Sequence, residues 1–314
     1  MKILITGASG FLGTALIPKL IAKGGTVYGL SRHPPAPSDN LIPFQGDITL
    51  PNLGLEEKEV PKGIRSVYHL AAIHRLNEDK DGSIWKTNVT GTENVIKFCL
   101  DHNIKRLYFC STAYTIGGKG RNPYEKSKIL CEKMVTESGI PGVTIFKPSI
   151  VMGTKESPYP GHFSQFVVLM VKVHQRAEII RRKIEGTLRL PILEPVFRVR
   201  GNSEGYLNLV LIDEVVKAMA EIRHTGIYWL TNPNPPTLGQ LISWVGESIL
   251  VNARFEKEFK HNPLEKIYQQ KAKVFGPYLQ GDDFPSHLRD HPLLTKDFIH
   301  ETIINTLFGN SALP

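Results

Sequence analysis

The chain has 314 residues, a formal net charge of +8, and a composition of 41% hydrophobic and 22% charged residues. These values exclude disordered and fibrous proteins, and the dispersed positive charge suits an anionic small molecule without predicting nucleic-acid binding. No apolar run reaches about 18 residues, no signal-peptide pattern is present, and the three cysteines show no zinc spacing, so we expect a cytoplasmic protein with neither a membrane span nor a metal site.

Short aliphatic runs alternate with amphipathic stretches through the first half of the chain. The amphipathic stretches predict helices over 10–23, 83–102 and 122–138. Pro18 interrupts the first of these, at a typical cost of about 3 kcal/mol, although the apolar residues around it keep helical spacing. Strand–helix alternation with short connections predicts a Rossmann-type, doubly wound α/β fold. The apolar runs that predict the buried parallel strands cover 2–6, 26–30, 41–45, 66–70, 106–111 and 143–147.

The second half of the chain has a different pattern. Residues 164–204 and 233–314 read as mostly helix and loop, whereas "LNLVLIDEVVKAMAEI" (207–222) and "GIYWLTN" (226–232) resemble a return to the first pattern. We therefore expect two domains. A nucleotide-binding domain would comprise 1–163 plus 205–232, and a smaller, mostly helical substrate domain 164–204 plus 233–314.

The stretch "TGASGFLG" places three glycines between the first strand and the first helix. Gly7 permits the tight turn, Gly10 lets the backbone approach a pyrophosphate, and Gly13 lets helix and strand pack closely. Phosphates would lie at the helix N-terminus, where free N–H groups favour negative charge. A glycine turn without a ligand is the alternative. The predicted phosphate site also includes Ser9, Phe11 and Leu12.

The end of the second strand selects between cofactors. An acidic residue there would bind the ribose hydroxyl of NAD, but this chain has Ser31 and Arg32 in "VYGLSRHP", which favours the phosphate of NADPH. The alternative is that Arg32 is a solvated loop residue. After the third strand, Asp47 either accepts a hydrogen bond from the adenine amino group or caps the following segment. We include Asp47 and its neighbour Ile48 in the predicted cofactor site.

The stretch "NPYEKSK" (122–128) carries the predicted chemistry. Asn122 can cap a helix, Pro123 suits its first position, and Glu125 completes a capping-box pattern. Tyr124 then lies in the first turn, with Lys128 one turn further along the same face. The ammonium group and the helix N-terminus lower the phenol pKa from about 10, so that the phenol can protonate a carbonyl oxygen as hydride arrives. Lys128 can also bind the ribose hydroxyls of the cofactor.

Hydroxyl groups follow the fifth predicted strand in "YFCSTAYTIGG". Ser111 and Thr112 lie at its carboxyl end, where ligands bind in this fold class. One hydroxyl there can stabilise a developing oxyanion, or it can bond to the local backbone instead.

The glycine turn, the hydroxyl residues at the end of the fifth strand and the Tyr-x-x-x-Lys stretch occur in this order along the chain. Together they resemble the extended short-chain dehydrogenase/reductase family over nearly the whole chain. Supporting stretches are "HLAAIH" (69–74), "NVTGTENVI" (88–96) and "KPSIVMG" (147–153), the last with Lys147 in place of an arginine. The resemblance implies that Thr112 is the catalytic hydroxyl, Tyr124 the acid/base and Lys128 its partner. It also implies a supporting role for Asn88 and places Ala71, Pro148 and Ser149 against the ribose and nicotinamide.

Within the family, "GDITLPNLGL" (46–55), "STAY" (111–114) and "LNLVLIDEVV" (207–216) are most similar to the thioester-reductase and fatty acyl-CoA reductase branch. This implies NADPH-dependent reduction of a carbonyl or acyl thioester, carried on coenzyme A or a carrier protein. Two alternatives stay open: a nucleotide-sugar epimerase or dehydratase that retains NAD, and a non-catalytic dinucleotide sensor. The family also contains dimers, so a homodimer through 83–102 and 122–138 is compatible with the resemblance.

Two further features bear on the substrate. Thr112 and Tyr124 are only twelve positions apart, whereas the family usually has a longer segment that walls the substrate site, so we expect a more open pocket. Residues 176–200 carry seven cations and three acids, a net +4, and predict either a site for a phosphorylated handle or a solvated basic helix face. We interpret His69, His74, His162 and Cys110 as packed residues rather than acid/base or nucleophilic groups.

Overall fold

The structure is a computed structural model that describes residues 1–154, 161–189 and 196–308. It divides into two compact units. The first comprises Met1–Ser157, Val210–Pro233 and Phe284–Arg289, and the second comprises Pro158–Leu209, Asn234–Asp283 and Asp290–Pro314. The sequence pattern assigned 284–289 to the substrate domain, but Phe284 and His287 pack with Trp229 and Tyr228 of the first unit.

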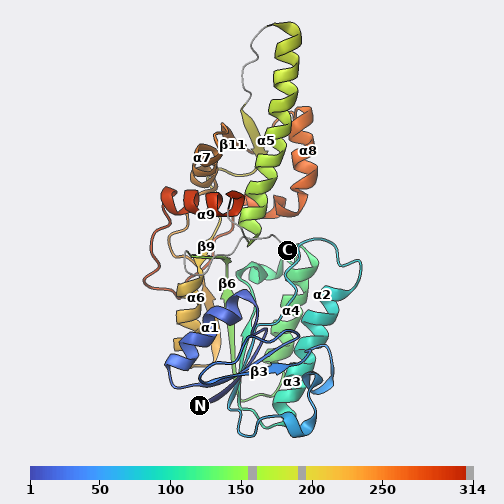
Figure 1. Cartoon of the computed structure of the whole chain (residues 1–314), viewed down its shortest axis with the longest axis vertical. Helices are drawn as coiled ribbons and strands as arrows, with labels where there is room; N and C mark the ends of the chain where they lie inside the picture. Colours follow the sequence, from blue (N-terminus) through green and yellow to red (C-terminus); the bar gives the residue numbers. More distant parts are fainter. Residues whose placement is uncertain (155–160, 190–195, 309–314) are drawn as a thin grey trace. The chain divides into compact units, whose positions relative to one another are not determined.

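A seven-stranded parallel sheet forms the centre of the first unit, in the order β10-β6-β5-β4-β1-β2-β3 (Figure 1). This confirms the predicted doubly wound α/β fold. Because all the strands are parallel, their carboxyl ends meet at one edge of the sheet, where this fold class binds ligands. The strands are β1 (Lys2–Thr6), β2 (Thr26–Ser31), β3 (Leu41–Gln45), β4 (Ser66–His69), β5 (Arg106–Cys110), β6 (Gly142–Pro148) and β10 (Gly226–Leu230).

Helices cover both faces of this sheet (Figure 1). On one face, α1 (Phe11–Ala22) and α6 (Ile212–Glu221) share a buried apolar core with β1, and the stacked rings of Tyr68 and Tyr108 lie in the same core. On the other face, α3 (Gly91–Asp101) and α4 (Pro123–Thr136) pack on the opposite side of β4 and β5. Both faces of the central strands are therefore buried, as the continuous apolar runs predicted.

The helix predicted over 83–102 consists of three joined pieces. A short α2 (Ser83–Trp85) leads into a π-helical turn at Lys86–Thr90, which continues as α3. Single π-helical turns inside α-helices are frequent at functional sites. This one carries Asn88, which the resemblance singled out.

Pro18 does not break α1, which runs without interruption to Ala22. The proline ring is exposed on the outer face of the helix. Pro18 leaves the carbonyl of Thr14 without its usual N–H partner within the helix.

The second unit is mostly helical, as predicted, with small strand pairs. Its helices are α5 (Gly161–Leu188), α7 (Leu238–Ile249), α8 (Pro263–Lys271) and α9 (Lys296–Phe308), and its strands β8 (Phe197–Arg200) and β11 (Ala253–Glu256) pair in parallel. A further pair joins β7 (Ile150–Met152), which belongs to the first unit, to β9 (Leu209–Leu211). Across the described ranges, no helix combines the length and apolar character needed to span a bilayer.

Short 3-10 segments cover Pro51–Gly54, Glu57–Glu59, Ala113–Gly118 and Lys273–Gln280.

Candidate active site

The glycine turn lies between β1 and α1 and is too tightly packed for larger residues. Gly7 adopts φ +75°, and a Cβ there would lie 2.8 Å from the backbone nitrogen of Ala71. A Cβ on Gly13 would lie 2.3 Å from the carbonyl oxygen of Gly7. Gly10 precedes α1 and supplies no side-chain cap, so the first N–H groups of the helix have no intrahelical acceptor. The turn fits a phosphate group, which would accept hydrogen bonds from these N–H groups.

At the end of β2, the hydroxyl Oγ of Ser31 is buried and has no hydrogen-bond partner among the described residues. A buried polar group without a partner is costly, and a ligand atom is one explanation for it. Arg32 follows directly and is exposed. The turn and this hydroxyl both fit a bound dinucleotide.

In the loop after β3, the residues predicted to contact the cofactor make local contacts within the protein. The carboxylate Oδ1 of Asp47 accepts a hydrogen bond of 2.8 Å from the backbone N–H of Thr49, which is the capping alternative. Ile48 is buried, and its side chain fills the space that a Cβ on Gly91 would need. One oxygen of Asp47 is therefore engaged by the local backbone, and the side chain of Ile48 packs against Gly91.

The ends of β4 and β6 supply the residues expected beside the nicotinamide. Ala71 follows β4 and donates its N–H to Oγ1 of Thr6 at 3.4 Å. Pro148 ends β6, and the next residue, Ser149, is buried and donates its N–H to the carbonyl of Leu230 at 3.3 Å. Both strand ends lie at the same edge of the sheet as the glycine turn.

Helix α4 begins with the predicted N-cap residue and the predicted proline. The Asn122 side chain accepts a hydrogen bond of 2.9 Å from the N–H of Glu125, and Pro123 occupies the first helical position. The Glu125 carboxylate accepts the N–H of Arg121 at 2.8 Å and contacts its guanidinium at 3.2 Å. These contacts place Tyr124 in the first turn, where its side chain is nearly buried.

Lys128 joins α4 to the end of β5. Its Nζ donates a hydrogen bond of 2.7 Å to the carbonyl of Cys110. The same nitrogen lies 4.8 Å from the ring centre of Phe109 and 5.9 Å from that of Tyr124. Burial lowers the pKa of the Lys128 ammonium, and the Glu132 carboxylate one turn further on opposes that shift. Tyr124 and Lys128 thus share one helix face, and the carbonyl that Lys128 contacts lies two residues before the predicted Thr112.

To the described residues, the Thr112 hydroxyl makes two long hydrogen bonds. Its Oγ1 donates to the carbonyl of Pro148 at 3.5 Å and accepts the N–H of Tyr114 at 3.3 Å. Bonds of this length are weak and can be exchanged for a ligand oxygen. The segment that follows turns sharply because Gly117 and Gly118 adopt positive φ values of 63° and 65°, which lets the short connection reach α4.

Asn88 holds the start of α4 through a residue that sequence reasoning missed. Its amide Nδ2 donates to Oγ of Ser127 at 2.9 Å and to the carbonyl of Ile73 at 3.1 Å, while its Oδ1 accepts the N–H of Ile73 at 2.8 Å. Ser127 in turn donates to the carbonyl of Tyr124 at 2.7 Å. The π-helical turn is therefore connected to the backbone of the predicted acid. The one signal for Ser127 was its place within the Tyr-x-x-x-Lys motif.

The two histidines near this site differ. His69 is buried between the hydroxyls of Thr6 (2.7 Å) and Thr92 (3.0 Å), and burial, helped by the charge of Lys128, lowers its pKa to about 3. It has the geometry of a packed residue. His74 is exposed, and its ring centre lies 4.5 Å from that of Tyr124. The side chain of His162 lies outside the described residues.

The basic stretch is partly neutralised within the second unit. Arg181 pairs with Glu178 (2.8 Å) and Glu185 (3.0 Å), and Arg198 pairs with the buried Glu265 (2.9 Å). These two arginines are therefore engaged by the protein itself. Arg176, Arg182, Lys183, Arg189 and Arg200 are exposed, and Glu194 lies outside the described residues.

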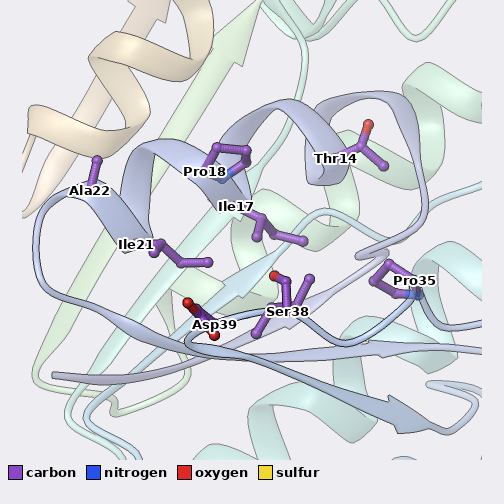
Figure 2. A pocket seen from close by; sticks show the side chains of 9 residues that line it. Thr14, Ile17, Pro18, Ile21, Ala22, Pro35, Ser38 and Asp39 are labelled. Carbon is purple, nitrogen blue, oxygen red and sulfur yellow. The ribbon is translucent and has the colours of Figure 1, made fainter.

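A groove of about 780 Å³ lies between α1 and the segment that leads into β3, and Figure 2 shows the side chains that line it. Ile17, Pro18 and Ile21 line one side, and Pro35, Ser38 and Asp39 line the other. None of the predicted site residues contributes to it.

Within the described ranges, no group of three or more His, Cys, Asp and Glu side chains could hold a metal ion.

Comparisons with known proteins identify the family. The model of the NAD dependent epimerase/dehydratase family matches residues 3–220. A UDP-glucose 4-epimerase from Halalkalibacterium halodurans is 32% identical over 43% of this chain and 45% of its own length. A 2-alkyl-3-oxoalkanoate reductase from Shewanella oneidensis is 24% identical over 77% of this chain and 64% of its own length. The chain thus spans between about half and two thirds of these relatives.

Solved structures support the fold. A UDP-glucose 4-epimerase from Thermotoga maritima, determined with UDP-glucose, superposes with a TM-score of 0.64 over 96% of this chain and 97% of that chain, at 18% identity. At this identity the likeness concerns the fold alone.

Proposed function

This chain belongs to the NAD dependent epimerase/dehydratase family and is an NAD(P)-dependent enzyme; from that premise, we propose that it reduces a carbonyl or acyl-thioester substrate by hydride transfer from NADPH, with Tyr124 as the general acid. The observation that carries the proposal is the position of Tyr124 and Lys128. They lie on one face of α4, and Lys128 is fastened to the end of β5 by its 2.7 Å bond to Cys110.

The cofactor would be held by backbone rather than by side chains at its phosphates. Gly7, Gly10 and Gly13 would leave room for the pyrophosphate at the start of α1, where the positive end of the helix dipole attracts it. Ser31 and Arg32 would bind the 2′-phosphate, since this position has a hydroxyl and a guanidinium but no carboxylate. When bound, the dinucleotide supplies the hydride.

Tyr124 would then give its phenolic proton to the substrate oxygen. The ammonium of Lys128 and the N-terminus of α4 both favour the phenolate that is left behind. Asn88 and Ser127 hold the backbone of that helical turn, so the phenol keeps its direction while the proton moves. Proton transfer by a positioned side chain typically contributes about 100- to 10,000-fold to the rate.

Thr112 would orient the substrate oxygen. Its hydroxyl can exchange the long 3.5 Å bond to the Pro148 carbonyl for a shorter one to that oxygen. The donor would then stabilise negative charge as it develops, at a point held by the end of β5. The substrate would be an oxoacyl compound or acyl thioester, on coenzyme A or a carrier protein, which is consistent with the similarity to an oxoalkanoate reductase.

A second candidate is an epimerase acting on a nucleotide-linked sugar. It is favoured by the 32% identity to a UDP-glucose 4-epimerase over nearly half of the chain. The same Tyr124 and Lys128 would serve, but the hydride would leave and return within one turnover. NAD would then stay bound to the enzyme.

A cofactor titration followed by a substrate panel separates these functions. Purified protein is titrated with NADPH and NADH, and released nucleotide is identified after denaturation. The panel contains an acyl-CoA, a 2-alkyl-3-oxo ester, an aromatic ketone and UDP-glucose. NADPH oxidation with any carbonyl compound supports the proposal. Conversion of UDP-glucose without net cofactor consumption contradicts it in favour of the epimerase. Tight dinucleotide binding with no turnover would favour a sensor.

A further inference from the structure

A buried ion pair that the proposed chemistry does not use lies beside the site. The carboxylate Oε2 of Glu132 contacts Nζ of Lys147 at 2.8 Å, and the two side chains are only 16% and 8% exposed. The other oxygen, Oε1, accepts hydrogen bonds from the hydroxyls of Ser111 and Thr115, the latter at 2.8 Å. Three donors therefore converge on one carboxylate inside the first unit.

Two of the three partners of Glu132 adjoin predicted site residues in the sequence. Ser111 comes directly before Thr112, and Lys147 comes directly before Pro148. Glu132 itself lies one helical turn beyond Lys128 on α4. Because β5 and β6 are neighbours in the sheet, with Cys110 opposite Phe146, one carboxylate joins the ends of both strands to α4.

Stability alone is a poor explanation for such an arrangement. Burying a carboxylate and an ammonium is costly, and an apolar replacement of similar volume is often as stable. An ion pair instead provides a defined geometry, because a carboxylate that accepts hydrogen bonds from several donors fixes the position of each donor group. Lys147 is further restrained by the ring of Trp229, whose centre lies 4.8 Å from Nζ.

We propose that Glu132 and Lys147 are positioning residues that fix the ends of β5 and β6 against the nicotinamide half of the cofactor. The inference rests on the proposed function, in which Thr112 and the Pro148–Ser149 segment face that half. The adenosine half would bind at Gly7–Gly13 and at Ser31–Arg32, on β1 and β2. In the sheet, β4 lies between these strands and β5, so loss of the pair should affect one half of the cofactor only.

Two ligands that differ only by the nicotinamide test this selectivity. Dissociation constants for NADP⁺ and for 2′-phospho-ADP-ribose are measured by calorimetry for the wild type and for Glu132→Gln, Lys147→Met and Lys147→Arg. If the wild type prefers NAD⁺, the two ligands measured are NAD⁺ and ADP-ribose. Glu132→Gln and Lys147→Met should weaken NADP⁺ about tenfold, the effect of losing one well-placed hydrogen bond. Lys147→Arg retains the charge and should stay within about twofold.

Binding of 2′-phospho-ADP-ribose should be unchanged in every variant, which also shows that the variant is folded. A single variant can fail to fold because it leaves one buried charge unpaired. In that case the two dissociation constants are compared in the double variant Glu132→Gln/Lys147→Met, which removes both charges. Glu265→Gln is the matched control, since it removes a different buried carboxylate, which contacts Arg198 in the second unit. It should lower the melting temperature without changing the ratio of the two dissociation constants.

The outcomes are distinct. Equal weakening of both ligands, or equal behaviour of Lys147→Met and Lys147→Arg, overturns the positioning role and leaves the proposed function standing. If the wild type binds neither dinucleotide, the proposed function itself fails. If the wild type binds NADP⁺ no better than 2′-phospho-ADP-ribose, the nicotinamide makes no contact for the pair to position, and the inference fails.

Discussion

The ammonium of Lys128 lies 2.7 Å from the main-chain oxygen of Cys110. This bond joins the middle of α4 to the last residue of β5, so the helix face that carries Tyr124 is fixed to the strand that leads to Thr112. Burial lowers the pKa of Lys128, and a backbone carbonyl at this distance compensates part of the lost hydration.

Replacing Tyr124 by phenylalanine removes the proposed acid without changing the ring. We expect kcat/KM for carbonyl reduction to fall by about 100- to 10,000-fold, the usual contribution of a positioned proton donor. The dissociation constant of NADPH should change little. Steady-state kinetics and a cofactor titration on the same preparation measure both. Tyr206→Phe, an exposed tyrosine in the second unit, is the control. Full turnover in Tyr124→Phe would refute the assignment.

Changing Arg32 to glutamate should reverse the cofactor preference. The guanidinium is proposed to bind the 2′-phosphate, whereas a carboxylate repels it and can accept the ribose hydroxyls of NADH. We expect the dissociation constant of NADPH to rise at least about tenfold, since a charged hydrogen bond is replaced by repulsion. Fluorescence titration with both cofactors measures this. Arg182→Glu, an exposed arginine of α5, should leave both affinities unchanged. An unchanged NADPH affinity in Arg32→Glu would show that Arg32 is a solvated loop residue.

An alanine at Gly13 should prevent dinucleotide binding. Its Cβ would lie 2.3 Å from the carbonyl of Gly7, so the turn and α1 must separate. We expect loss of measurable binding together with a lower melting temperature. Gly186→Ala is the matched control, because a Cβ there meets no atom within 4 Å and its position is helical. That control should stabilise its helix by about 0.5–1 kcal/mol and leave binding intact. Retained NADP⁺ binding in Gly13→Ala would contradict the proposed phosphate site.

His69 should make stability depend on pH. Its pKa is lowered to about 3 in the folded protein, mainly by burial, from 6.5 in the unfolded chain. Between these values the unfolded chain binds the proton and the folded chain does not, so stability is complete above the unfolded pKa and falls as pH drops. The slope from this group approaches about 1.4 kcal/mol per pH unit.

Urea unfolding between pH 7.5 and 4.5 measures this slope. His69→Asn removes the titrating group and should reduce the slope by about that amount, whatever it does to absolute stability. His224→Gln changes an exposed histidine and should leave the slope as in the wild type. Identical slopes for the wild type and His69→Asn would show that His69 does not titrate differently on folding.

The sequence was sufficient to predict the parallel sheet and the positions of its strands along the chain. Runs such as "KILIT" and "RLYFC" are apolar throughout, a pattern that requires burial on both faces, and six predicted strands coincide with β1 to β6 within two residues at either end. The N-cap of α4 was also predictable, because Asn122 and Pro123 act within one turn of chain.

Contacts between distant segments were not predictable in the same way. Nothing in the local pattern indicates that Glu132 meets Lys147, since the two lie on different elements and pair only after β5, β6 and α4 assemble. The π-helical turn at Asn88 was hidden for a related reason. Its single extra residue is stabilised by bonds to Ile73 and Ser127, which come from other parts of the chain.

Tyr124, Lys128 and Glu132 recur at every fourth position along α4, and this regular spacing limits how the gene can change. Inserting or deleting one residue between them would rotate one group about 100° around the helix axis relative to the next, because an α-helix has 3.6 residues per turn. Point substitutions elsewhere on α4 leave that alignment intact. Length variation in descendants of this chain should therefore collect ahead of Asn122, in the glycine-rich connection, and be absent from the stretch between the phenol and the carboxylate.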